Sequence, residues 1–248
     1  MTAWRLAGLL SLLMCCSAGA TAQELRRATV WDLKIGQPIA AQPSAGEFRG
    51  FACGSDGGPP RRPLKGWSDY KLCPPEASGL YEVYFEYDDE YEYIARARDL
   101  PRDVARWAGT TEAGVPVIVS ALFASDGILK GIRMITDARP EHRDETTDAD
   151  LKTRKQAYQL GGFLASRFGI DASRDCTALP AANGESSVGE LFIKRSCQRS
   201  DATADRKITL RVNYFRRPGE SGVNPQMPTE LTSGQFESSA RLEILSLD

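Results

Sequence analysis

The strongest constraint on the fold is a two-residue alternation of apolar and polar side chains over 80–87. The odd-numbered positions hold Tyr81, Val83, Phe85 and Tyr87, and the even-numbered positions between them hold Glu82, Tyr84 and Glu86. A period of two is typical of a β-strand with one buried face. The alternation resumes over 91–98 after a turn at 88–90. A β-hairpin is therefore predicted over 79–98, with Phe85 opposite Tyr93 and Glu82 opposite Arg96.

Two more hairpins and a closing strand are predicted further along the chain. Segments 115–124 and 128–136 are joined by Ser125, Asp126 and Gly127, and the first segment is apolar on both faces. A strand of that kind is expected in the interior of a sheet. Segments 190–198 and 207–215 are separated by a polar loop, and 236–247 has the composition of a final strand. We therefore expect antiparallel hairpins that form one or two sheets.

One amphipathic helix is predicted over about 148–168. Thr147 suits the N-cap, and Gly169 suits the position after the last turn. Gly161 and Gly162 each lower helix stability by about 1 kcal/mol relative to alanine, so we expect the helix to pack closely onto the sheet there. The expected fold class is α+β, with this helix packed on a sheet face and two local disulfides.

The cysteines predict the disulfides. After Cys15 and Cys16, which lie in an apolar N-terminal run, the chain holds Cys53, Cys73, Cys176 and Cys197. An even number of cysteines in an exported chain indicates disulfide pairing. Three connectivities are open, and the spacing favours Cys53–Cys73 and Cys176–Cys197, each stabilising the fold by about 3 kcal/mol. A zinc site is disfavoured because no two of these cysteines lie close enough in sequence and the chain holds a single histidine.

The N-terminus has the features of a secretory signal peptide. Arg5 precedes an apolar run over 6–16, and small residues over 17–22 suit a signal peptidase. The run is shorter than the ~20 residues that a membrane-spanning helix needs. We expect cleavage after about residue 22, which places the mature chain 23–248 in the periplasm or outside the cell with no further transmembrane segment. Lipidation at Cys15 or Cys16 stays an alternative, and the mature chain is expected as one region or as two subdomains, about 23–136 and 137–248.

Charge and motif content restrict the function classes. The formal net charge is −2, which is too small to indicate a nucleic acid or an anionic membrane surface as partner. The sequence has no nucleophile elbow, P-loop, dinucleotide fingerprint or EF-hand, so no cofactor or metal is expected. His142 lies among charged residues, unlike the rigidly held base of a catalytic triad. Carboxylate chemistry stays open because two suitably placed acids suffice for a glycosidase.

Three segments are candidate interaction sites. The first is the polar side of the predicted first hairpin, formed by Tyr84, Glu82, Glu86, Arg96 and Arg98, because tyrosine and arginine are enriched at protein interfaces. The second is the glycine- and proline-rich loop 54–65, whose two arginines could hold an anion, with an ordinary solvated loop as the simpler alternative. The third is the acidic turn 88–92, where calcium binding competes with a turn that only keeps the hairpin soluble.

The leading functional hypothesis is a soluble, non-enzymatic periplasmic or secreted protein. It would bind a partner protein or a small ligand in the cell envelope. The alternatives are a carboxylate-dependent envelope hydrolase and a structural or assembly accessory of the envelope. Convergent acids of perturbed pKa in a deep pocket would favour the hydrolase, whereas an exposed aromatic patch would favour a binding protein.

Overall fold

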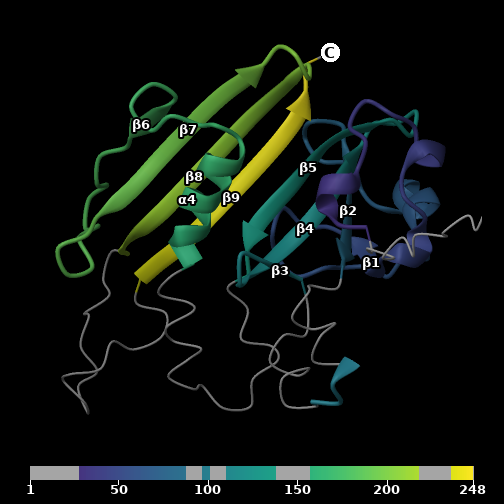
Figure 1. Cartoon of the computed structure of the whole chain (residues 1–248), viewed down its shortest axis with the longest axis horizontal. Coiled ribbons are helices and arrows are strands. Elements are labelled where there is room, and N and C mark those ends of the chain that lie inside the picture. Colours follow the sequence, from purple (N-terminus) through teal and green to yellow (C-terminus); the bar gives the residue numbers. More distant parts are fainter. Residues whose placement is uncertain (1–27, 88–96, 101–109, 138–156, 218–235, 248) are drawn as a thin grey trace, which may run out of the picture.

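The fold is dominated by one antiparallel β-sheet. The computed structural model describes residues 28–87, 97–100, 110–137, 157–217 and 236–247. In these residues the sheet order is β1-β2-β4-β5-β9-β8-β7-β6, and β3 pairs with β4 (Figure 1). The strands are β1 (Arg49–Cys53), β2 (Tyr81–Glu86), β3 (Thr111–Glu112), β4 (Val115–Phe123), β5 (Leu129–Thr136), β6 (Cys176–Ala178), β7 (Ile193–Asp201), β8 (Arg206–Arg216) and β9 (Phe236–Ser246). The predicted signal segment 1–22, His142 and the acidic turn 88–92 lie outside the described residues.

The helical elements are short, and most are 3₁₀ turns. These are η1 (Val30–Asp32), η2 (Ile39–Ala41), η3 (Ala45–Glu47), η4 (Trp67–Leu72) and η5 (Ala157–Gln159), and η5 leads into the α-helix α4 (Leu160–Arg167). The predicted helix over 148–168 is thus present in its last two turns, and 148–156 lie outside the described residues. The molecule is more sheet-rich than the α+β expectation, with one short α-helix in its described part.

Both later hairpins form as predicted. In the β4–β5 hairpin, Val119 lies opposite Met134, and almost every residue of β4 is buried on either face. In the β7–β8 hairpin, Ile193 lies opposite Tyr214 and Asp201 opposite Arg206, so the connecting turn is shorter than predicted. The two disulfides also have the predicted connectivity, Cys53–Cys73 and Cys176–Cys197.

The predicted pairing of the first hairpin is wrong. Strand β2 occurs where the alternation placed it, but Val83 lies opposite Cys53 of β1 on one side and Ala121 of β4 on the other. Both edges of β2 are thus occupied, which leaves no edge free to pair with 91–98. The alternation identified the face that joins the apolar core, but Glu82 and Tyr84 on the other face are buried too, and the neighbouring strands come from distant segments.

The C-terminal strand β9 lies inside the sheet. It pairs with β5, where Met134 lies opposite Leu242, and with β8, where Leu210 lies opposite the same Leu242. The sheet and its apolar core therefore run without a break across residue 136, where the sequence suggested a subdomain boundary.

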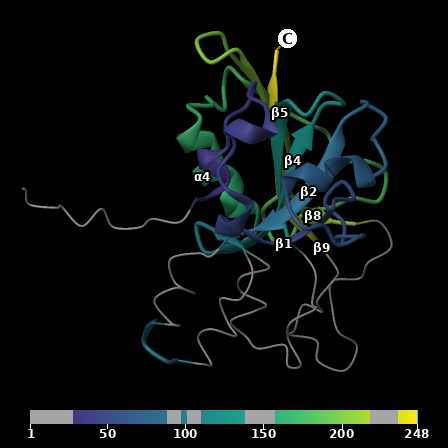
Figure 2. The same cartoon turned by 90° about the vertical axis from the view of Figure 1, so that its right-hand side faces the viewer.

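One face of the sheet carries the apolar core. The N-terminal 3₁₀ segments, in purple, and α4 lie on the same side of the strands in Figure 2. Their buried side chains, including Val30 and Leu160, join those of the strands in one cluster. Aromatic rings fill its β1–β2 end, with the ring centroids of Trp67 and Phe51 4.7 Å apart and those of Trp67 and Phe85 5.0 Å apart. Such close edge-on ring packing stabilises a core beyond simple area burial.

The glycine pair of α4 confirms close packing at one of its two positions. A Cβ at Gly161 would lie 2.3 Å from Val212 Cγ2 on β8, so only glycine allows this approach. A Cβ at Gly162 would meet nothing within 4 Å. Gly169 has a φ of 59°, in agreement with its predicted place after the last helical turn.

Candidate functional site

The loop 54–65 lies against the polar face of the sheet and is held at both ends. Cys53 forms the disulfide to Cys73, and its N–H donates to Arg62 O at 2.8 Å while Arg61 N–H donates back to Cys53 O at 2.9 Å. A Cβ on Gly54 would lie 2.3 Å from Glu82 Cδ. Gly54 thus allows the loop to approach β2, and Gly57, where a Cβ would lie 2.1 Å from Ile135 Cδ1, allows it to approach β5, a role that the sequence pattern did not reveal.

An arginine lies beneath this loop and forms the centre of an ion cluster. Arg133 of β5 donates from Nε to Glu243 Oε1 at 2.7 Å and from Nη1 and Nη2 to the two Glu76 oxygens at 2.6 and 3.2 Å. Its Nη1 is also 3.2 Å from Glu82 Oε2 and 3.2 Å from Asp56 Oδ1. The Arg133 side chain is only 7% exposed. We call these five residues, together with Arg241, the Arg133 cluster.

Asp56 connects the loop to the cluster. Its backbone N–H donates to Glu82 Oε2 at 2.7 Å, and its carboxylate accepts from Arg241 Nη2. Arg241 Nη2 also donates to Glu243 Oε1 at 2.7 Å. Asp56 has a φ of 59°, a left-handed conformation that aspartate tolerates better than most residues. The polar face of β2, β5 and β9 thus fixes the path of the loop through charge-assisted hydrogen bonds.

The carboxyl groups of the cluster differ in acidity. Burial raises the pKa of Glu82, and the Asp56 N–H and the Arg133 charge offset this only in part. Burial also acts to raise the pKa of Glu243, but hydrogen bonds from Arg241 and Arg133 outweigh it and hold that pKa below its usual value. Glu82 therefore takes up a proton more readily than Glu243 as the pH falls.

The centre of the cluster, Arg133 and Glu82, is buried. The Glu82 side chain is 4% exposed, so its raised pKa does not make it an accessible general acid. The part of the chain that the structure describes contains no group of three or more acidic, histidine or cysteine side chains arranged to hold a metal ion. The buried centre of the cluster can hold the loop in place, whereas the Asp56 side chain is 66% exposed and is paired with Arg241.

The residues predicted as an interaction surface do not form an exposed patch together. Tyr84 and Glu82 are buried, so the expectation that they face solvent is wrong. The loop 54–65 contacts β2 at Glu82, and Tyr84 is buried with Ala52 of β1 and Ile118 of β4. Glu86 is half-buried and accepts from Tyr84 Oη at 2.6 Å. Arg98 is exposed, and Arg96 lies outside the described residues.

Sequence reasoning missed Arg133, although one signal could have revealed it. The segment 129–136 is an apolar strand interrupted by an arginine at an interior position. A buried arginine needs acidic partners, so its place inside a central strand predicts an ion pair. The partners could not be predicted because Glu76 and Glu243 lie 57 and 110 residues away in the chain.

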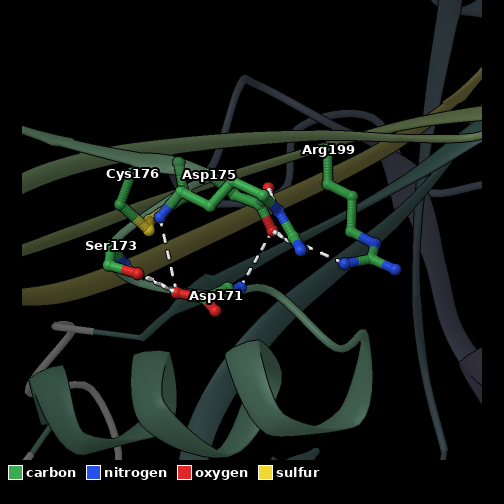
Figure 3. Close-up of a disulfide and its surroundings, with 7 residues drawn as sticks. Asp171, Ser173, Asp175, Cys176 and Arg199 are labelled. Carbon is green, nitrogen blue, oxygen red and sulfur yellow. Dashed lines mark hydrogen bonds and ion pairs between the residues drawn. A yellow bond between two sulfur atoms is a disulfide. The ribbon is translucent and has the colours of Figure 1, made fainter.

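A second polar cluster surrounds the Cys176–Cys197 bond (Figure 3). Asp171 Oδ1 accepts from the Ser173 N–H at 2.8 Å and from Ser173 Oγ at 2.6 Å. Asp175 Oδ2 accepts from the Asp171 N–H at 2.9 Å and lies 3.5 Å from Arg199 Nη1. A hydrogen bond from Arg174 holds the pKa of Asp175 well below its usual value. These contacts satisfy one another and shape the turn between α4 and β6.

A third cluster joins the N-terminal segment, the β3–β4 tip and α4. The Glu112 carboxylate accepts from Trp31 Nε1 at 3.2 Å and from Tyr87 Oη at 3.2 Å. The Arg167 guanidinium lies 4.2 Å from the centre of the Trp31 ring. Burial raises the pKa of Glu112, and the hydrogen bonds from Trp31 and Tyr87 oppose that effect. This cluster fastens the end of α4 to the sheet.

Comparison with known proteins assigns no family. No family model matches the chain, and no curated protein or solved structure shows a significant similarity to it. Among the residues that the structure describes, no helix has the length and apolar character needed to cross a membrane. The functional argument therefore depends on the arrangement of the chain's own side chains.

Proposed function

We propose that this protein is a non-enzymatic binding protein of the cell envelope, soluble in the periplasm or secreted, with a partner protein or a small ligand as its target. The predicted signal peptide over 1–22 supports the compartment, and two disulfides are compatible with an oxidising one. The proposal does not depend on a cofactor.

The observation that carries the proposal is the way in which the charged side chains of the Arg133 cluster pair with one another. Its buried centre, Arg133 and Glu82, pairs internally, and the exposed Asp56 carboxylate pairs with Arg133 and Arg241, so these charges hold a surface loop in place. Binding residues are commonly presented on loops that a rigid scaffold positions. A disulfide, backbone hydrogen bonds to β1 and the Asp56 contacts together give the loop 54–65 such a scaffold.

The hydrolase alternative has one observation in its favour, the raised pKa of Glu82, because a general acid needs such a shift. An E82Q variant separates the two hypotheses. Hydrolysis of envelope polysaccharide that E82Q abolishes would favour the enzyme. The binding hypothesis expects no hydrolysis by either protein.

The direct test is site-specific cross-linking in the native organism. A photoreactive amino acid at Ser68, exposed on η4, should give a discrete adduct with one partner, which mass spectrometry identifies. The same amino acid at Ala202, exposed in the β7–β8 turn, is the matched control and should not give that adduct. The proposal would be contradicted if probes at Ser68 and at positions throughout 54–65 gave no adduct and no small molecule co-purified with the protein.

The compartment has its own test. Mass spectrometry of the periplasmic fraction should find an N-terminus near Gln23 and no thiol that alkylates before reduction. A retained Met1 or four alkylatable cysteines would contradict the export part of the proposal.

A further inference from the structure

The stapled loop, defined as residues 53–73, exposes an unusual number of positive charges. Arg61, Arg62, Lys65 and Lys71 are all exposed, and all lie within a short stretch of the chain. Within the described residues, none of these four side chains forms an ion pair. Their contacts are a 3.5 Å hydrogen bond from Arg62 Nη1 to Leu72 O and the Lys71 ammonium 5.7 Å from the Tyr70 ring centre.

The negative charges of the same region are directed elsewhere. Asp56 binds Arg241, and Glu76, just beyond the loop, binds Arg133. Asp69 accepts from the Lys65 backbone N–H at 2.8 Å, which fixes the backbone and leaves the Lys65 ammonium outside. Asp56 and Glu76 are thus paired with arginines of the sheet, although the Asp56 side chain is 66% exposed, while the four cations stay at the surface. In a chain with a net charge of −2, this separation produces a local cationic surface.

The cationic surface is also held in one shape. The residues 61–64 run back along β1, where Leu64 N–H donates to Phe51 O at 2.8 Å. The disulfide fixes Cys73 beside β1, and Pro59, Pro60 and Pro63 restrict the backbone between them. A surface that is already ordered loses less conformational entropy on binding, which favours a specific partner.

One large apolar side chain accompanies the charges. Leu72 is 47% exposed, next to Lys71 and the buried Cys73. A basic surface with an exposed leucine matches an acidic segment that carries an apolar residue. Arginine guanidinium groups bind carboxylates through paired hydrogen bonds, which gives such a contact direction as well as charge.

We propose that Arg61, Arg62, Lys65, Lys71 and Leu72 form the docking surface for an acidic segment of a partner protein. This inference depends on the proposed binding function and specifies where and how the partner is held. A lipid membrane fits this surface less well than an acidic protein segment does, because stable membrane attachment takes a basic cluster together with substantial apolar insertion. Leu72 is the only large apolar side chain that the stapled loop exposes to that degree.

The test measures binding of a fluorescent polyglutamate peptide to the full mature protein. The test variant is R61Q/R62Q/K65Q, and the matched control is R195Q/R211Q/K34Q, which removes the same charges from exposed positions elsewhere. The wild type and the control should bind the peptide at low salt, and the test variant should bind at least tenfold more weakly. Binding should weaken as salt rises. Circular dichroism should show unchanged melting for both variants.

Three results would overturn the proposal. They are no peptide binding by the wild type, an equal loss in the control variant, and preferential binding to phosphatidylglycerol vesicles. The cross-linking experiment distinguishes a failure of the docking-surface proposal from a failure of the proposed binding function. A partner that the Ser68 probe captures equally well in the R61Q/R62Q/K65Q background would preserve the binding function and refute this docking surface.

Discussion

Arg133 shows how one side chain can organise a surface. A planar guanidinium has five N–H donors, and this one uses three of them on Glu76 and Glu243 while facing Glu82 and Asp56. A lysine ammonium has the charge but lacks the fork geometry needed to bind two carboxylates in this arrangement. The residue thus connects β5 to β9 and to the segment after Cys73.

Replacing Arg133 should strongly destabilise the fold. R133M leaves several carboxylates buried without their cation, and breaking a buried ion pair in this way costs about 3–5 kcal/mol. R133K should cost less because it keeps the charge. Urea denaturation monitored by tryptophan fluorescence measures both effects, with R195Q as the exposed arginine control. An R133M stability close to that of the wild type would show that the cluster contributes little.

Glu82 should affect stability in a pH-dependent way. Burial raises its folded-state pKa, so its contribution is complete below the unfolded pKa and is lost as pH rises through the folded value. E82Q removes the ionisation while its amide oxygen can still accept from the Asp56 N–H. The free energy of unfolding of E82Q relative to wild type should therefore increase between about pH 4 and pH 8.

Glu243 provides the opposite control for that measurement. Its pKa is lowered, so its stabilising contribution is present above the unfolded pKa and is lost as pH falls. E243Q should therefore become less stable relative to wild type as pH rises from about 2 to about 5, and the difference should stay constant above that. If the free energy of unfolding relative to wild type changed with pH in the same direction for both variants, the assignment of opposite pKa shifts would be contradicted.

At the scale of elements, the two adjacent glycines of α4 should respond in opposite ways to alanine. G161A places a Cβ 2.3 Å from Val212 Cγ2, and overpacking of this kind costs about 1–3 kcal/mol. G162A meets open space and should stabilise the helix by roughly 1 kcal/mol. Thermal unfolding of the two single variants measures the difference. The double variant G161A/V212A should recover part of the loss, and no recovery would mean that another contact is responsible.

The elements also show where sequence reasoning reaches its limit. Alternation correctly gave the extent of β2 and the face that joins the core, though its other face is also buried, and the short turn at Gly127 correctly gave the β4–β5 hairpin. Alternation carries no information about which strand lies alongside, so the partners β1 and β4 of β2 could not be predicted. The exposed surface expected at Tyr84 failed for the same reason, because Tyr84 is buried against Ala52 of β1 and Ile118 of β4.

At the scale of the whole molecule, the position of β9 decides how the two halves of the chain combine. A strand at the end of a sequence can lie at the edge of a sheet or in its middle, and the composition of 236–247 does not distinguish them. In this fold it lies between β5 and β8, so the first and second halves share one core through it.

Removal of residues 236–248 should therefore abolish cooperative folding. The deletion exposes the edges of β5 and β8 and takes Leu242 and Ile244 out of the core, where burial of each stabilises by about 1.5–3 kcal/mol. It also removes Glu243 from Arg133. Because a domain of this kind has a total stability of only about 5–15 kcal/mol, these losses together should unfold it.

The control for this deletion removes only the last two residues, since Leu247 is exposed and its N–H donates to Asp205 O at the end of the sheet. That shorter deletion should keep a cooperative urea transition and near-ultraviolet circular dichroism close to wild type. Adding a synthetic peptide of 236–248 to the longer deletion should restore part of the tertiary signal, because the vacated position is bounded by two complementary edges. A longer deletion that still unfolds cooperatively would instead show that the segments before and after residue 137 fold as independent subdomains.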